Sequence, residues 1–422
     1  MSDNGSIASG LKVGIVGGSI AGSVAAIELS RIGCEVMVFE RSKGHFEDRG
    51  AGIASSYDHL NLLKERDLLD EDYPYVSMDG GIWTIPSDDD RFGRVIWRNP
   101  AAAGGMNWGV LFANHRKRVP EGIYHAGCSI VDLVVNEDGS VRLVLEDGCE
   151  FEFDLVIFAD GYHSWGRNYL YPEAEMEYAG YVIWRGLIDE SQVPDGMFDT
   201  ESEWAVHEDG LCIFYMIPGQ NGEHEQGKRR VNWAWYNVVP EGQLNDLLTD
   251  KYGRLHETSL PQGGATEEHV KHIHDRARQK LRGVAADVIC ATEDPFIQVI
   301  YDLHVPSYVR GRICLIGDAS SIARPHTGAG AIKAQQQAIA LSKALSTHES
   351  LDSALRAWDD EVWDAGDKQV SLGKVLGRAL VTEAPDWNEM DEDRMAKWWG
   401  DATSGVYVYY FDDATSGEKT SK

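Results

Sequence analysis

The stretch from Leu11 to Arg41 constrains the fold of this chain more than any other part of the sequence. An apolar run ends at Val16 in a glycine-rich turn, a helical pattern follows from Ser23 to Ile32, and a second apolar run ends on Glu40. Gly33 stands where the end of a helix favours a left-handed residue. Strand, tight turn, helix and strand in this order are the setting in which a glycine fingerprint binds a dinucleotide. The sequence therefore predicts an α/β fold with a Rossmann-like domain at its start.

The turn from Gly17 to Gly22 is predicted to hold the pyrophosphate of that nucleotide. Gly17 permits the tight turn, Gly22 lets the helix approach the strand, and the helix N-terminus offers N–H groups. Ser19 replaces the second glycine of the fingerprint, and its hydroxyl can bond a phosphate oxygen. Glu40 can bind ribose hydroxyls and would repel a further phosphate, so we expect FAD or NAD(H) rather than NADP(H). The alternative is a βαβ unit whose glycines serve only packing.

The composition argues against several kinds of partner. With 68 Asp and Glu against 39 Lys and Arg, the net charge of −29 disfavours nucleic acid and anionic membrane surfaces. We expect no membrane span, because no run of 18 apolar residues occurs, and no signal peptide in Met1–Gly10. Six scattered cysteines without a CxxC pair favour reduced thiols in a cytoplasmic protein. His269, His272 and His274 lack a Cys, Asp or Glu that completes a plausible site, so no metal is expected.

Two further apolar strands each end in a glycine beside an acid, at Asp160–Gly161 and at Gly317–Asp318. Open α/β sheets bind ligands at such strand ends. After the second, a glycine-rich turn from Arg324 to Gly330 opens a helix from about Ala331 to Leu345, whose N-terminus can hold negative charge. Between Gly161 and Gly317, residues 178–303 contain aromatic-rich strands that predict a separate antiparallel sheet, which we call the platform.

We call the strand ends at Glu40, Asp160–Gly161 and Gly317–Asp318 the first, second and third acid–glycine stations. These three stations and the Pro325–Gly330 turn, in this order, resemble the class A flavoprotein monooxygenases, the single-component FAD-dependent aromatic hydroxylases. Tyr178–Gly186, Tyr215–Gly219, Arg324–His326 and Lys333 resemble the branch of 2,6-dihydroxypyridine 3-hydroxylases, which act on hydroxylated N-heterocycles. The resemblance implies a p-hydroxybenzoate hydroxylase-like fold: a Rossmann-like FAD-binding domain, an antiparallel β-sheet substrate domain and C-terminal helices. The expected segments are the FAD-binding domain in two parts (1–175 and 296–345), the platform (176–295), and a C-terminal helical region with a polar tail (346–422).

The same resemblance implies which residues bind FAD: Gly17, Gly18, Ser19, Ile20, Ala21, Gly22, Glu40, Arg41, Gly52, Ile53, Asp160, Gly317, Asp318, Gly328, Ala329, Gly330 and Ala331. Asp318 would bind the ribityl chain, Asp160 would lie in a motif linked to both FAD and NAD(P)H, and Gly328–Ala331 would face the flavin N1–C2=O edge. Two features depart from the family. Met106–Leu111 lacks the usual arginine, although Arg116 is near, and Lys333 stands where many relatives have asparagine.

In this family NADPH or NADH binds transiently as a co-substrate and reduces FAD. The reduced flavin then reacts with O2 to give a C4a-hydroperoxide, which hydroxylates an electron-rich ring. The implied partners are O2, a small aromatic substrate and, for the chain itself, a second copy in a homodimer. Tyr215, Arg185 and His326 are the candidate catalytic residues, because each can orient or deprotonate a hydroxyl, although each can equally be hydrogen-bonded core.

The Trp and Tyr residues crowded between positions 178 and 239 suit stacking on a flat ring, but Trp233 and Trp235 are expected to serve platform packing. Two alternatives stay open. One is a flavin epoxidase or N-hydroxylase on the same fold, and the other is a flavin- or NAD-binding sensor without turnover.

Overall fold

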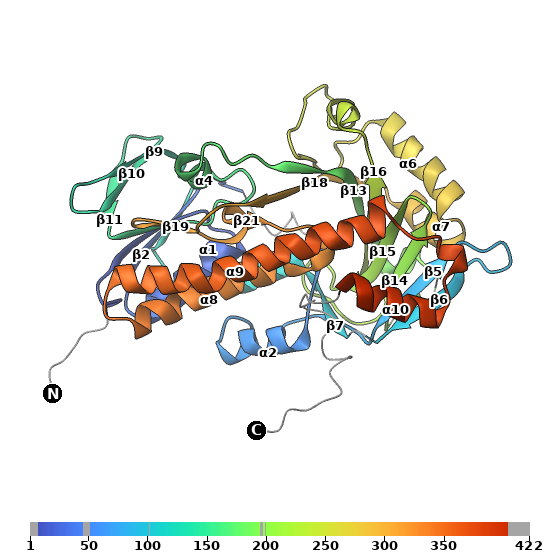
Figure 1. Cartoon of the computed structure of the whole chain (residues 1–422), viewed down its shortest axis with the longest axis horizontal. Coiled ribbons are helices and arrows are strands. Elements are labelled where there is room, and N and C mark those ends of the chain that lie inside the picture. Colours follow the sequence, from blue (N-terminus) through green and yellow to red (C-terminus); the bar gives the residue numbers. More distant parts are fainter. Residues whose placement is uncertain (1–6, 45–50, 101, 195–196, 199, 404–422) are drawn as a thin grey trace.

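A computed structural model describes residues 7–44, 51–100, 102–194, 197–198 and 200–403 (Figure 1). Residues 45–50 lie outside the described residues, and they include the first two residues of a glycine-rich crossing that the sequence predicts from Arg49 to Ile53. The segment 404–422, with the expected polar tail, also lies outside them.

The nucleotide-binding domain is built on a six-stranded sheet in the order β19-β20-β12-β1-β2-β8. Its strands are β19 (Val309–Arg310), β20 (Ile313–Leu315), β12 (Leu155–Phe158), β1 (Lys12–Val16), β2 (Glu35–Glu40) and β8 (Tyr124–Ala126). All neighbours are parallel except β19 and β20. The fingerprint turn and both later acid–glycine stations therefore come together at the carboxyl ends of β1, β12 and β20.

Helices and a small sheet cover opposite faces of this six-stranded sheet. Helix α1 (Ile20–Arg31) packs on one face, where Gly22 lies near Ile15, and α8 (Ala329–Thr347) packs against α1. On the other face, β11 (Glu150–Phe153) places Phe153 against Gly14. It belongs to a three-stranded sheet with β10 (Val141–Leu145) and β9 (Ile130–Val135). The sequence pattern predicts one strand from Ile123 to Val131, but the structure has two there, because β8 joins the six-stranded sheet and β9 the small one.

The platform is a nine-stranded sheet with the path β17-β18-β13-β16-β15-β14-β5-β6, and β21 also pairs with β18. Its strands are β17 (Ser259–Leu260), β18 (Phe296–His304), β13 (Glu177–Asp189), β16 (Arg230–Val238), β15 (Gly210–Ile217), β14 (Ser202–His207), β5 (Gly81–Ile85), β6 (Arg94–Asn99) and β21 (Ser321–Ile322). The expected platform segment, 176–295, leaves out β5, β6, β18 and β21. The β5–β6 hairpin joins through a parallel pairing with β14, a long-range contact that local sequence patterns do not reveal.

Each face of the platform has its own core. One face packs against α6 (Glu267–Lys280) and α7 (Gly283–Ala291), and there Trp233 and Trp235 are fully buried. The other face meets α9 (Leu351–Gly377), a π-helical turn (Arg378–Thr382) and α10 (Glu392–Thr403). Figure 1 shows α9 running beside α8 and onward to the platform. The C-terminal helices thus connect the two domains.

A second small sheet lies between the domains, in the order β3-β7-β4, from β3 (Gly52–Ser55), β7 (Ala103–Asn107) and β4 (Val76–Met78). The remaining α-helices are α2 (Tyr57–Glu65), α3 (Trp108–Arg116), α4 (Trp165–Leu170) and α5 (Leu244–Leu247). In the described part of the chain, none of the helices is both long and apolar enough to cross a bilayer. The same residues contain no cluster of three or more His, Cys, Asp or Glu side chains suited to a metal ion.

Candidate active site

The fingerprint turn is too tight for side chains at its first and last glycines. Gly17 has a φ of +99°, and a Cβ there would lie 2.4 Å from the Ala159 carbonyl oxygen. A Cβ on Gly22 would lie 1.9 Å from the Gly17 carbonyl oxygen. Because the turn is so compact, α1 begins at Ile20, three residues before the expected start at Ser23. Ile20, Ala21 and Gly22 therefore form the first turn of α1.

The N-terminus of α1 is open to an anion. Ser19 is the N-cap residue, and within the described structure its side chain caps no N–H of the helix. The first turn contains no acidic residue. The N–H groups at this end and the Ser19 hydroxyl thus offer donors to a phosphate.

Glu40 ties the end of β2 to the fingerprint turn. Its side chain is 6% exposed, and its two oxygens accept hydrogen bonds from the Gly18 N–H at 2.8 Å and the Ser42 N–H at 2.7 Å. Each carboxylate oxygen has further lone pairs, so Glu40 can still accept from a ribose hydroxyl. Arg41 follows as an exposed residue at the strand end.

Tyr124 holds Arg116 beside the same turn. The Tyr124 hydroxyl donates to the Gly18 carbonyl oxygen at 3.3 Å, and a Cβ on Gly18 would meet that hydroxyl at 2.4 Å. The Arg116 guanidinium stacks over the Tyr124 ring, 3.9 Å from its centroid. Because Tyr124 is on β8, next to β2, this positive charge is held near the turn even though α3 lacks an arginine at its start. Sequence reasoning missed Tyr124, which no local motif marks.

Arg167 connects the second and third acid–glycine stations. It is 2% exposed and donates hydrogen bonds to the carbonyl oxygens of Asp318 at 3.1 Å and Tyr162 at 2.5 Å. Asp160 accepts a hydrogen bond from the Trp165 N–H at 2.7 Å, and burial raises its pKa. The other Asp160 oxygen, Oδ1, is buried without a hydrogen-bond partner among the described residues. Such an orphaned acceptor fits a site that a ligand completes.

The third station brings the start of α8 to the start of α1. Gly317 has a φ of +64°, and a Cβ there would lie 3.2 Å from Ala21 Cβ and 3.6 Å from Ala334 Cβ. The α8 N-cap, Gly328, also has a left-handed φ, +65°, and the first turn of α8 has no acid. Beside it, Asp318 is 46% exposed and Gly330 is exposed. Two uncapped helix N-termini and a half-exposed acid thus converge, an arrangement that fits an extended, anionic dinucleotide.

Arg185 and Tyr215 lie on one face of the platform. Arg185 pairs with Ala234, and Tyr215 pairs with Asn232, two residues earlier on β16. Side chains two apart on a strand share a face, so Arg185, Ala234, Asn232 and Tyr215 form one surface. Trp233 and Trp235 alternate with them and point to the opposite face, under α6 and α7. Trp233 and Trp235 therefore serve the packing of the platform, as their sequence context predicts.

This face holds the backbone of β3 at Gly52. Arg185 donates to the Gly52 carbonyl oxygen at 2.8 Å, and Asn232 Oδ1 accepts from the Gly52 N–H at 2.8 Å. A Cβ on Gly52 would lie 2.5 Å from Asn232 Cγ, so the segment passes in direct contact with the platform. Arg185 Nε and Asn232 Nδ2 are buried without hydrogen-bond partners among the described residues. The sequence does not single out Asn232, because the neighbouring tryptophans Trp233 and Trp235 belong to the opposite face of the sheet.

Tyr215 is a protonated phenol in this setting. Burial raises its pKa to about 12, although the positive charge of Arg185 acts in the opposite direction. Its ring lies beside β7, where a Cβ on Gly105 would approach Tyr215 Cδ2 to 3.5 Å. At neutral pH its hydroxyl can therefore donate or share a proton but does not carry a charge.

His326 occupies a different place from the other two candidates. Its Nε2 lies 3.0 Å from the Gly373 carbonyl oxygen on α9, so Nε2 carries the proton. Burial lowers its pKa to about 4, and its ring lies 5.5 Å from the Tyr236 ring. Tyr236 is four residues beyond Asn232 on β16, so His326 packs toward the other end of the face that carries Tyr215. These contacts are typical of a neutral, packed imidazole that joins the Arg324–Gly330 turn to α9.

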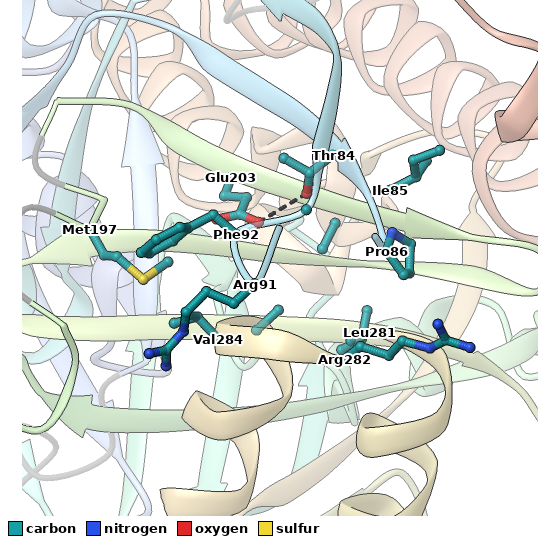
Figure 2. Close-up of a pocket in the computed structure, with 13 residues that line it drawn as sticks. Thr84, Ile85, Pro86, Arg91, Phe92, Met197, Glu203, Leu281, Arg282 and Val284 are labelled. Atoms are coloured by element: carbon teal, nitrogen blue, oxygen red, sulfur yellow. Dashed lines mark hydrogen bonds between the residues drawn. The ribbon is translucent and has the colours of Figure 1, made fainter. Parts of the chain in front are cut away.

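Figure 2 shows a pocket on the other side of the platform sheet, outside this site. Glu203 reaches into it and accepts a hydrogen bond from the Thr84 hydroxyl at 2.9 Å, beside Phe92 and Met197. Glu203 alternates along β14 with residues of the opposite core, and its strand neighbour Phe214 belongs to the core under α6 and α7. The pocket is therefore separated by the sheet from Arg185 and Tyr215.

Glu203 should make the protein less stable as the pH rises. Burial raises the pKa of Glu203 from 4.5 to about 7, so the folded state keeps this proton over a range where the unfolded chain loses it. The contribution of Glu203 to the free energy of unfolding falls between pH 4.5 and about pH 7, its two pKa values, and is constant above them. Glu203→Gln should therefore be more stable than the parent at about pH 8, by roughly 3 kcal/mol, and similar to it at about pH 4. Thermal unfolding across this range, with exposed Glu121→Gln as control, measures the difference; equal curves for parent and Glu203→Gln would contradict it.

The comparisons with known proteins agree with this geometry. A family model described as "FAD binding domain-like" matches residues 178–302, and one described as "NAD(P)-binding Rossmann-like domain" matches residues 15–45. The 2,6-dihydroxypyridine 3-monooxygenase of Paenarthrobacter nicotinovorans is 30% identical over 380 residues, covering 87% of this chain and 91% of the relative. Fold and site define a single-component flavoprotein of the p-hydroxybenzoate hydroxylase-like type.

The chain belongs to the family of FAD-dependent aromatic hydroxylases, and it is an FAD-dependent monooxygenase that uses NAD(P)H and O2. The structure of 2,6-dihydroxypyridine-3-hydroxylase from Arthrobacter nicotinovorans has a TM-score of 0.81 and 27% identity, covering 90% of this chain and 96% of that one. Salicylate hydroxylase of Pseudomonas putida is 27% identical over 438 residues, covering 91% of this chain and 94% of that relative.

Proposed function

We propose that the enzyme hydroxylates an aromatic or N-heteroaromatic ring that already carries a hydroxyl group, at the carbon next to that group. The observation that carries this proposal is the shared platform face of Arg185 and Tyr215, in contact with the β3 backbone at Gly52. A guanidinium group favours an ionised hydroxyl or a ring carbonyl, and a neutral phenol can share the proton. Ionising the hydroxyl enriches the neighbouring ring carbon in electrons. Two relatives, named for dihydroxypyridine and salicylate, act on rings of this kind.

We further propose that the convergent strand ends hold FAD through Gly17–Gly22, Glu40, Arg41, Gly52, Ile53, Asp160, Gly317, Asp318 and Gly328–Ala331. Arg116, held over Tyr124, adds a positive charge for the pyrophosphate. FAD supplies the redox and oxygen chemistry, while the side chains bind, orient and exclude water. His326 serves as a positioning residue, which holds the Arg324–Gly330 turn against α9, because its Nε2 is already bonded to the Gly373 carbonyl oxygen.

A matched panel of substrates tests the first proposal. Hydroxypyridines and phenols should stimulate NAD(P)H oxidation and give hydroxylated products, whereas their methoxy counterparts should not, because they have no proton to share with Tyr215. The measurement is product formed per NAD(P)H consumed. Failure of every hydroxylated ring, with turnover of an alkene or an amine instead, would move the enzyme to the epoxidase or N-hydroxylase alternative.

We also propose a cytoplasmic location and a homodimer. All six cysteines are free thiols, three of them buried, which suits a reducing compartment. The homodimer rests on the family resemblance alone, and light scattering of the purified protein measures it directly.

A further inference from the structure

A buried lysine near the start of α8 has no role in the site described so far. Lys333 lies one helical turn after Ala329, and its side chain is 3% exposed. Its ammonium group donates hydrogen bonds to the backbone oxygen and the hydroxyl of Ser321. Burial lowers the pKa of Lys333, and a positive charge near the positive end of a helix is unfavourable. A lysine in this place therefore needs a nearby anion.

That anion is Asp318. Lys333 Nζ lies 3.7 Å from Asp318 Oδ1, and the lysine side chain is buried whereas the carboxylate is 46% exposed. The backbone of Asp318 is held independently, because Arg167 donates to its carbonyl oxygen. The Asp318 side chain thus forms an ion pair with a buried cation, while the exposed part of the carboxylate stays accessible to a ligand.

We propose that Lys333 is a positioning residue for FAD, which fixes the Asp318 carboxylate for a cofactor hydroxyl and adds a buried positive charge at the start of α8. The proposal rests on the assignment of Asp318 as an FAD ligand. Two consequences follow. Lys333 contributes to FAD affinity through Asp318, and its charge favours the reduced, anionic flavin over the oxidised form, in the same sense as the N-terminus of α8.

A double-mutant cycle on FAD binding tests the first consequence. Lys333→Met removes the charge and keeps the length of the side chain, and Asp318→Asn removes its partner. Titration of the apoprotein with FAD should show a roughly tenfold weaker Kd for Lys333→Met in the parent, and less than about a threefold change in the Asp318→Asn background. Equal losses in both backgrounds, or no loss in the parent, would overturn the proposal.

The flavin midpoint potential tests the second consequence. Lys333→Met should weaken binding of reduced FAD about tenfold relative to oxidised FAD, which lowers the two-electron potential by about 30 mV. Lys343→Met, an exposed lysine on the same helix, is the matched control and should leave the potential unchanged. If Lys333→Met does not fold, Lys333→Gln replaces it in both measurements, because the glutamine amide removes the charge and can still donate to Ser321. An unchanged potential in the folded variant would overturn the proposal. Neither measurement uses a substrate, so failure here is distinct from failure of the proposed hydroxylation.

Discussion

Tyr215→Phe should reduce coupled hydroxylation by roughly 10²–10⁴-fold while the enzyme keeps its FAD. The Tyr215 hydroxyl is a protonated phenol on the face that also carries Arg185, and it is the group best placed to share a proton with a substrate hydroxyl. Without it the ring stays less electron-rich, so NAD(P)H oxidation should yield hydrogen peroxide in place of hydroxylated product. The measurement is product and peroxide formed per NAD(P)H consumed, and NAD(P)H oxidation should continue.

Tyr178→Phe is the matched control for this prediction. Tyr178 lies on β13 of the same sheet, but its hydroxyl donates to the Val239 carbonyl oxygen at 2.8 Å. Its loss should cost about 1 kcal/mol of stability and leave the coupling ratio unchanged. If Tyr215→Phe kept the parent's coupling ratio, the residue would have no part in the chemistry.

Glu40→Arg should yield protein with little or no bound FAD. The carboxylate accepts two backbone hydrogen bonds that shape the fingerprint turn, and it is the only acid of β2 that faces inward. The substitution removes both bonds and buries a positive charge without the acceptors that a ribose needs. Each ribose hydroxyl that loses its bond to a charged acceptor costs about 1.5–3 kcal/mol of binding, so the loss of two such bonds should lower FAD affinity roughly a hundredfold or more. The ratio of flavin to protein absorbance after purification measures this.

Two further variants separate cofactor binding from folding. Glu40→Gln keeps one acceptor oxygen and should retain an intermediate amount of FAD. Glu35→Arg changes the same kind of residue at the exposed start of the same strand and should retain it fully. Full flavin occupancy in folded Glu40→Arg would remove Glu40 from the cofactor site.

Features that depend on neighbouring residues were predictable from the sequence. The fingerprint turn, Glu40, the two later acid–glycine stations and the helix after Gly328 each lie within one strand–turn–helix unit, where spacing and glycine placement decide the backbone path. The start of α1 was expected three residues late, because Ser19 and Ile20 look like loop until the compactness of the turn at Gly17 is known.

Features that depend on which face of a strand is covered were not predictable. Arg185 and Tyr215 could be placed on strands, but only the packing of α6 and α7 shows that the tryptophans point the other way. The membership of β5 in the platform comes from a parallel pairing with β14, more than a hundred residues away in the chain. The same holds for Lys333, whose partners Ser321 and Asp318 meet it only because α8 folds back on that loop.

The most direct test of the central claim is turnover of a hydroxylated pyridine or phenol under isotopically labelled O2, followed by mass spectrometry of the product. The account predicts that the product gains one labelled oxygen atom at the carbon next to the original hydroxyl, with one NAD(P)H consumed for each product formed. Products without label, or labelled oxygen found only in hydrogen peroxide for every ring tested, would contradict it.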